Sequence, residues 1–132
     1  IVPGRPWDEA LDVACRLAAE RGAQIWAVTV LEVPLHLPLT AELPFEEEGA
    51  DRELDEAVAI GETYGVRVVP RLLRARSAGP ELVAEASRRG AEIVIVGTPR
   101  RGRRSALLGR TVEHVLKNAP CRVMVAAGNE AA

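Results

Sequence analysis

Aromatic residues are scarce in this chain, at 3% of 132 residues. The core must therefore be built from Val, Leu, Ile and Ala, and base-stacking platforms for single-stranded nucleic acid are not expected. No stretch approaches the roughly 18 apolar residues of a membrane span, and no signal peptide is visible. The formal net charge is only −2, which gives the whole protein no attraction for nucleic acid or an anionic membrane. We therefore expect neither a nucleic-acid partner nor direct membrane insertion.

Cysteine and histidine are also rare, with two of each. Cys15 and Cys121 form no CxxC or metal-ligand spacing, so we expect small core residues rather than nucleophiles, and no metal site. Unpaired cysteines suit the reducing cytoplasm. His36 is expected in a loop and His114 on a solvated helix face, and neither is assigned a catalytic or metal-binding role.

The common phosphate-handling motifs are missing. There is no GxGxxG after the first apolar segment and no Walker A sequence. A receiver domain needs acids after its first strand and an aspartate after its third, where this chain has Gly4-Arg5 and Arg74. Standard dinucleotide-binding, P-loop and phosphorylatable receiver domains are thereby excluded.

The length suits one domain, and residues 1–132 are predicted to form it. Ile1-Val2-Pro3 resembles the end of a strand whose beginning is absent. We therefore expect the natural chain to extend upstream. Whether it is free-standing or part of a larger protein stays open.

Hydrophobic periodicity predicts alternating elements. Apolar residues with helical spacing run through 7–21, where Ala10, Leu11 and Ala14 share a face. The prolines of 32–45 predict an irregular connection, and Pro70 indicates an edge strand. Helices are predicted over 7–21, 46–64, 77–90 and 109–118, and strands over 1–3, 24–31, 66–73, 92–97 and 122–126.

This alternation predicts the α/β class: a three-layer, doubly wound parallel sheet with helices on both faces. Ligands of such sheets bind beyond the carboxyl ends of the strands, at the topological switch point. Here that edge consists of Gly4-Arg5 after the first strand and Gly97-Thr98 after the fourth.

Charge is unevenly distributed. Between Glu42 and Glu56 there are eight acids against one base, Arg52, which predicts a solvated loop and helix start. Between Gly97 and Arg110 there are five arginines and no acid. These arginines fall on a predicted loop at the ligand-binding edge.

Residues 91–127 carry a specific pattern: a strand ending in glycine, a basic loop, Leu-Leu-Gly, a helix, Ala-Pro-Cys and a final strand. This closely resembles the carboxy-terminal half of universal stress proteins, and the opening of the chain resembles their start. The resemblance implies their fold, shared with adenine nucleotide alpha-hydrolase-like proteins, with a five-stranded sheet ordered 3-2-1-4-5. It also implies a stress-response role and, often, dimerisation through the last strand.

Many members of that family bind ATP through G-x-x-G-x9-G-[ST] and an aspartate after the first strand. In this chain Gly97 and Gly109 match two glycines, but Arg100 replaces the other and only eight residues separate it from Gly109. Arg110 replaces the closing Ser or Thr, although Thr111 follows, and Arg5 replaces the aspartate.

Pro99 also lies inside this loop and has no N–H to offer a phosphate. Three interpretations stay open: a solvated surface loop, an anion or altered nucleotide site, and an ATP site. The candidate nucleotide- or anion-binding residues are Arg5, Gly97, Thr98, Arg100, Gly109, Arg110 and Thr111. No cofactor is required by this pattern, and ATP or AMP stays open as a ligand.

The resemblance favours a non-catalytic regulatory or binding domain with a degenerate nucleotide loop, in some settings an appendage of a membrane transporter. The alternative is an ATP- or AMP-binding universal stress protein with slow ATPase activity. No general base is expected in the crevice, because its segments contain no Asp, Glu or His before Asp8. The last strand, with Val123 and Val125 on one face and Met124 on the other, predicts a two-fold homodimer.

Overall fold

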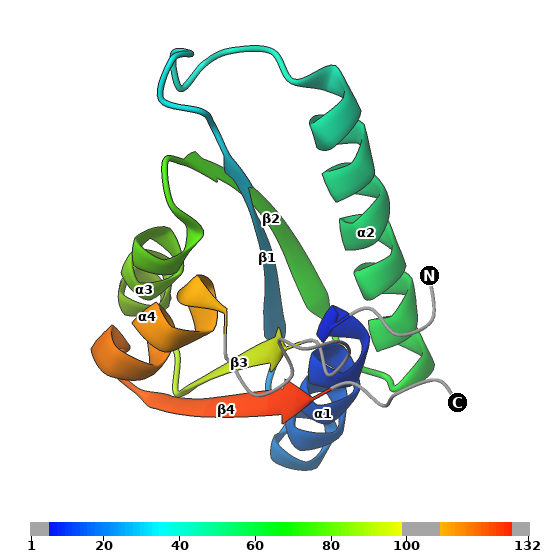
Figure 1. Cartoon of the computed structure of the whole chain (residues 1–132). Coiled ribbons are helices and arrows are strands. Elements are labelled where there is room, and N and C mark those ends of the chain that lie inside the picture. Colours follow the sequence, from blue (N-terminus) through cyan, green and yellow to red (C-terminus); the bar gives the residue numbers. More distant parts are fainter. Residues whose placement is uncertain (1–5, 99–108, 128–132) are drawn as a thin grey trace.

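Helices and strands alternate along the whole part of the chain that the computed structural model describes, residues 6–98 and 109–127. The elements are α1 (Pro6–Arg21), β1 (Ile25–Glu32), α2 (Pro44–Thr63), β2 (Val68–Ala75), α3 (Ala78–Arg89), β3 (Ile93–Thr98), α4 (Arg110–Asn118) and β4 (Arg122–Ala127). The predicted α/β class is confirmed (Figure 1).

The described strands form two parallel pairs, β1 with β2 and β3 with β4. Ile25 of β1 is opposite Val68, and Ile93 of β3 is opposite Arg122. These are the outer pairs of the expected 3-2-1-4-5 order. The strand expected between them, residues 1–3, lies outside the described residues, so the five-strand order stays a prediction.

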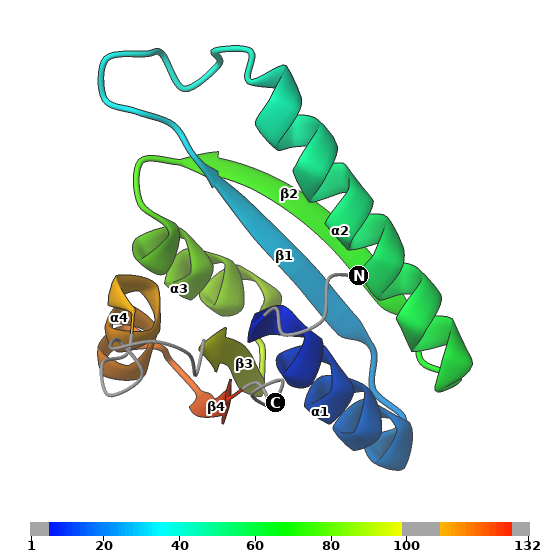
Figure 2. The ribbon, with the colours of Figure 1, turned by 45° about the vertical axis from the view of Figure 1, so that its right-hand side comes forward.

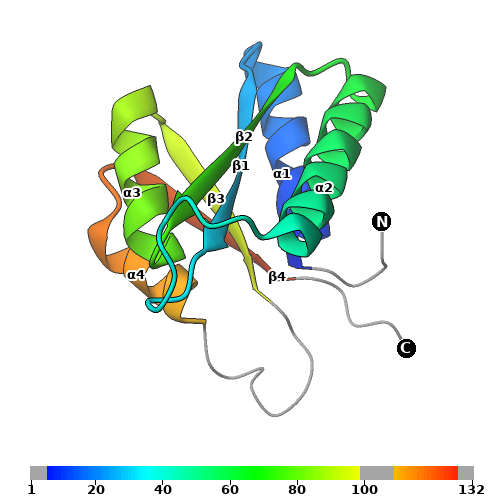
Figure 3. The same ribbon diagram turned by 90° about the horizontal axis from the view of Figure 1, so that it is seen from above.

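The helices cover the strands from two sides. Seen from above, α1 and α2 lie on one side of the strands and α3 and α4 on the other (Figure 3). α2 lies along the β1–β2 pair (Figure 2), α1 packs on β3 and β4, and α3 packs against α4. This is the predicted three-layer arrangement.

The best-buried cluster joins α1, α2 and β2 and contains Leu11, Cys15, Ala57 and Val68. Cys15 has no exposed surface. Burial, and then the neighbouring charge of Asp12, raises the pKa of its thiol. Cys15 is therefore the inert core residue that the sequence predicts, in an aliphatic core.

The element boundaries differ from the prediction around prolines. α2 begins at Pro44 rather than at residue 46. Pro44 was expected to keep the chain irregular, but proline suits the first helical position, where its fixed φ fits and its missing N–H is not needed. α3 ends as expected at Gly90, whose φ of 61° is a left-handed conformation that glycine adopts without strain.

Candidate functional site

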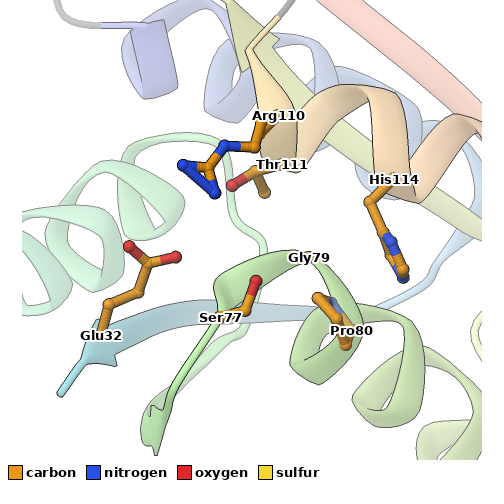
Figure 4. A pocket seen from close by; sticks show the side chains of 7 residues that line it. All are labelled: Glu32, Ser77, Gly79, Pro80, Arg110, Thr111 and His114. Carbon is orange, nitrogen blue, oxygen red and sulfur yellow. The ribbon is translucent and has the colours of Figure 1, made fainter. Parts of the chain in front are cut away.

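A cavity of about 270 Å³ lies where β1 ends and where α3 and α4 begin. Its walls therefore come from the strand ends and helix starts that a ligand meets in a doubly wound sheet. The lining residues are Glu32, Ser77, Gly79, Pro80, Arg110, Thr111 and His114 (Figure 4).

The start of α4 supplies the positive side of this cavity. Gly109 is the N-cap residue, with φ −68° and ψ 162°, and no side chain among the described residues caps the helix. The first-turn N–H groups and the helix dipole therefore favour an anion here. The Arg110 guanidinium and the Thr111 hydroxyl point toward the same space as the Glu32 carboxylate (Figure 4).

Glu32 supplies the negative side and also organises α3. Its Oε2 atom accepts a hydrogen bond from the backbone N–H of Ala78 at 2.8 Å, across 46 positions of sequence. Ser77 is the N-cap residue of α3, yet its side chain makes no capping hydrogen bond. Glu32 therefore takes over the capping role, and the Ser77 side chain lines the cavity instead.

The two helix starts meet at Gly79 and His114. A Cβ atom built on Gly79 would lie 2.8 Å from the Cβ of His114 and 3.0 Å from its Cγ. The His114 side chain is half-buried. His114 is therefore only partly solvated, because α3 lies against part of its side chain.

The family model described as the universal stress protein family matches residues 6–127. This chain belongs to the universal stress protein family. A curated universal stress protein from Methanocaldococcus jannaschii is 32% identical over 125 residues, covering 89% of this chain and 72% of that protein.

Solved universal stress proteins share the fold. One from Burkholderia pseudomallei is 29% identical, covers 94% of this chain and 89% of its own, and superposes with a TM-score of 0.68. One from Archaeoglobus fulgidus in complex with dAMP is 19% identical, with coverages of 96% and 92% and a TM-score of 0.75. A third, in complex with cAMP, is 20% identical, with coverages of 91% and 86% and a TM-score of 0.69.

The cavity of this universal stress protein domain contains part of the predicted site. Arg110 and Thr111 line it, and Gly109 immediately precedes them. Gly97 and Thr98 are the last two residues of β3. Arg5 and Arg100 lie outside the described residues, so their position in the domain stays a prediction.

Sequence reasoning missed Glu32, Ser77, Gly79, Pro80 and His114 as lining residues. The segments expected to form the crevice, Gly4-Arg5 and Gly97-Thr98, contain no acid or histidine, whereas Glu32 and His114 line this cavity from β1 and α4. Sequence reasoning considered only the loops after the first and fourth strands. Glu32 directly follows an apolar strand, and the carboxyl ends of parallel strands lie at one edge of the sheet. Its position in the sequence could therefore have indicated that Glu32 lies at the ligand-binding edge.

Metal and membrane features can be judged for residues 6–98 and 109–127. No group of three or more His, Cys, Asp or Glu side chains is placed there to hold a metal ion. Over the same residues, none of the helices combines the length and the apolar character that a membrane span needs.

Proposed function

We propose that this universal stress protein domain is a non-catalytic regulatory module that binds a small phosphate-bearing ligand at the start of α4. ATP binds weakly or not at all. One observation carries the proposal: Arg110 and Thr111 line a cavity at an N-terminus that no described side chain caps.

The chemistry of this end of the cavity suits a phosphate. The first-turn N–H groups of α4 offer partial positive charge, and a guanidinium can hold two phosphate oxygens at once. The Thr111 hydroxyl adds a further donor. Relatives of the same fold were solved with the monophosphates dAMP and cAMP, which supports a nucleoside monophosphate as the ligand class.

The cavity also disfavours a triphosphate. The Glu32 carboxylate faces the same space as Arg110 and repels each additional negative charge. In the sequence motif that ends at Gly109, Pro99 lacks an N–H and Arg100 replaces a family glycine.

The alternative, an ATP-binding domain with slow ATPase activity, draws support from Glu32 and His114, which could act as proton acceptors. The geometry favours it less, since Glu32 already accepts the hydrogen bond of the Ala78 N–H. Release of inorganic phosphate from ATP, absent in Glu32→Gln, would establish this alternative. We expect no release above the background of the buffer.

We propose the cytoplasm as the location, because Cys15 and Cys121 are both unpaired. We further propose a homodimer through β4, on which Met124 is 38% exposed. The domain then works as a free-standing regulator or as an appendage of a larger protein such as a transporter.

Calorimetric titration with AMP, cAMP, ATP and sulfate tests the binding proposal. We expect AMP to bind more tightly than ATP. A lost hydrogen bond to a charged group is worth roughly 1.5–3 kcal/mol, so Arg110→Ala should weaken AMP binding about 10- to 100-fold. Thr111→Val should weaken it less, because its lost donor is uncharged.

Arg52→Ala is the matched control, since Arg52 lies on α2 and pairs only weakly with Glu48 at 3.7 Å. Micromolar, magnesium-dependent ATP affinity would overturn the claim of weak ATP binding. Anion affinity unchanged in the double variant Arg100→Ala, Arg110→Ala would overturn the phosphate site.

A further inference from the structure

Three large apolar side chains are exposed on one short stretch at the start of α2 and in the connection before it. Leu35 is 86% exposed, Leu39 44% and Phe45 84%. Single exposed leucines need no explanation, but three large exposed apolar side chains on one segment favour an interaction surface there. We refer to Leu35, Leu39 and Phe45 as the apolar edge. Figure 1 shows the connection as an arch between the end of β1 and the start of α2.

The first half of this arch is held in place by Arg76, which follows the end of β2. Its Nη1 atom lies 3.3 Å from the carbonyl oxygen of Val33, 2.6 Å from that of Pro34 and 2.7 Å from that of Leu37. A single guanidinium thus fixes the backbone on both sides of Leu35.

The second half is held by Arg74, at the end of β2. Its Nη1 atom donates to the carbonyl oxygens of Leu39 at 3.1 Å and Ala41 at 2.7 Å, and its Nη2 atom pairs with the Glu47 carboxylate. Glu47 also accepts the backbone N–H of Leu43 at 3.0 Å. The apolar edge is therefore preorganised, which lowers the entropic cost of binding a partner.

The surroundings of the apolar edge are acidic. Glu42, Glu46 and Glu48 are exposed, and the structure gives Glu42 and Glu46 no ion pair among the residues it describes. Between positions 32 and 51 the sequence contains no lysine or arginine. A partner of this edge therefore meets apolar side chains and a field of negative charge together.

We propose that the apolar edge docks a protein segment whose apolar side chains are flanked by lysines or arginines, such as a basic amphipathic helix. Such a segment matches both the exposed apolar side chains and the surrounding carboxylates. A second copy docked by a two-fold axis would place the same glutamates against each other. An anionic bilayer would meet them with charge of the same sign.

A fluorescent helical peptide of leucine and lysine, with a leucine–glutamate peptide of equal length beside it, tests the proposal by anisotropy. We expect the leucine–lysine peptide to bind and the leucine–glutamate peptide not to bind. The double variant Leu35→Ser, Phe45→Ser should weaken binding about tenfold or more, because two exposed apolar anchors are lost. Leu116→Ser, which removes another exposed leucine on α4, should leave it unchanged.

A charge-matched pair of variants separates a specific edge from general attraction to an acidic protein. One double variant is Glu42→Gln, Glu46→Gln, and the other is Asp51→Asn, Asp55→Asn, which removes two exposed acids further along α2. The first should weaken peptide binding, and reduce its salt dependence, more than the second. Equal effects of the two pairs, or equal binding of both peptides, would overturn the proposal. So would self-association that Leu35→Ser, Phe45→Ser abolishes, or sedimentation of the protein with phosphatidylserine vesicles.

Discussion

Gly79 on α3 lies so close to His114 on α4 that no side chain fits between them. A Cβ atom on Gly79 would meet the imidazole Cδ2 at 3.2 Å as well as the nearer Cβ and Cγ atoms. This contact brings the starts of the two helices together, and both starts line the proposed ligand cavity. The shape of the cavity thus depends on a residue that offers no ligand group.

Gly79→Ala should destabilise the protein by about 1–3 kcal/mol, because the added methyl group must displace His114. The same shift should weaken AMP binding. Gly49→Ala is the control, because a Cβ atom there would meet only the Arg52 Nη2 atom at 4.0 Å. We expect no loss of stability from it, and a gain of up to about 1 kcal/mol because alanine has the higher helix propensity. Urea unfolding measures both, and equal stability of the two variants would contradict the close contact.

Glu85 is expected to contribute a pH-dependent part of the stability. It is 3% exposed and accepts hydrogen bonds from Arg88 Nε at 3.1 Å and Arg89 Nε at 2.9 Å, with Arg71 Nε at 3.4 Å. Burial by itself raises the pKa of Glu85, but the hydrogen bonds and charges of Arg88 and Arg89 outweigh it. The pKa therefore lies below its usual value.

A carboxyl group whose pKa is lower in the folded than in the unfolded state stabilises the fold above the unfolded pKa, about 4.3. That contribution is lost as the pH falls through the folded pKa. We expect Glu85→Gln to cost about 1–3 kcal/mol at pH 7, and the gap to wild type to narrow below about pH 4.3. A gap that stays constant from pH 7 to pH 3 in urea unfolding would contradict this.

Arg76→Lys should loosen the connection between β1 and α2. A lysine keeps the charge, but its side chain is one bond shorter than the path to the Arg76 Nη1 atom, which makes all three contacts to carbonyl oxygens in this structure. We expect about 1 kcal/mol of lost stability and faster chymotrypsin cleavage within residues 33–43. Chymotrypsin should cleave the control variant Arg52→Lys, on α2, at the wild-type rate. Identical cleavage rates for the two variants would show that Arg76 does not hold the connection.

Met124→Lys should dissociate the proposed homodimer. β4 pairs with β3 and with no other strand in the described ranges, which leaves its outer edge free for a second copy. A lysine at position 124 would face the same lysine of the second copy across the two-fold axis, and the two positive charges would repel each other. Sedimentation at micromolar concentration should show a dimer for wild type and for Leu116→Lys, and a monomer for Met124→Lys. A wild-type monomer would refute the dimer.

Local patterns predicted the elements well, for a physical reason. The apolar residues of 7–21 recur with helical spacing, so a helix places them on one face that can be buried. The structure has this helix as α1, Pro6–Arg21. The β-branched run in residues 24–31 similarly became β1, Ile25–Glu32. Periods of 3.6 and 2 residues are properties of the backbone, so they can be recognised without knowing what each face packs against.

The cavity was only partly predictable, because its residues are neighbours in space alone. Arg110 and Thr111 were found through the family motif, whereas Glu32 reaches the Ala78 N–H across 46 positions. No local pattern states that a strand-end glutamate will cap a distant helix.

The sequence by itself determined the α/β class, the family, the order of the helices and strands and the aliphatic core, since each follows from local periodicity or from a contiguous motif. Only the tertiary structure decided that Glu32 faces Arg110, that Gly79 receives His114, and that Arg74 and Arg76 hold the apolar edge open to solvent. These relationships depend on where separate elements cross, and crossing geometry is set by the packing of the whole domain.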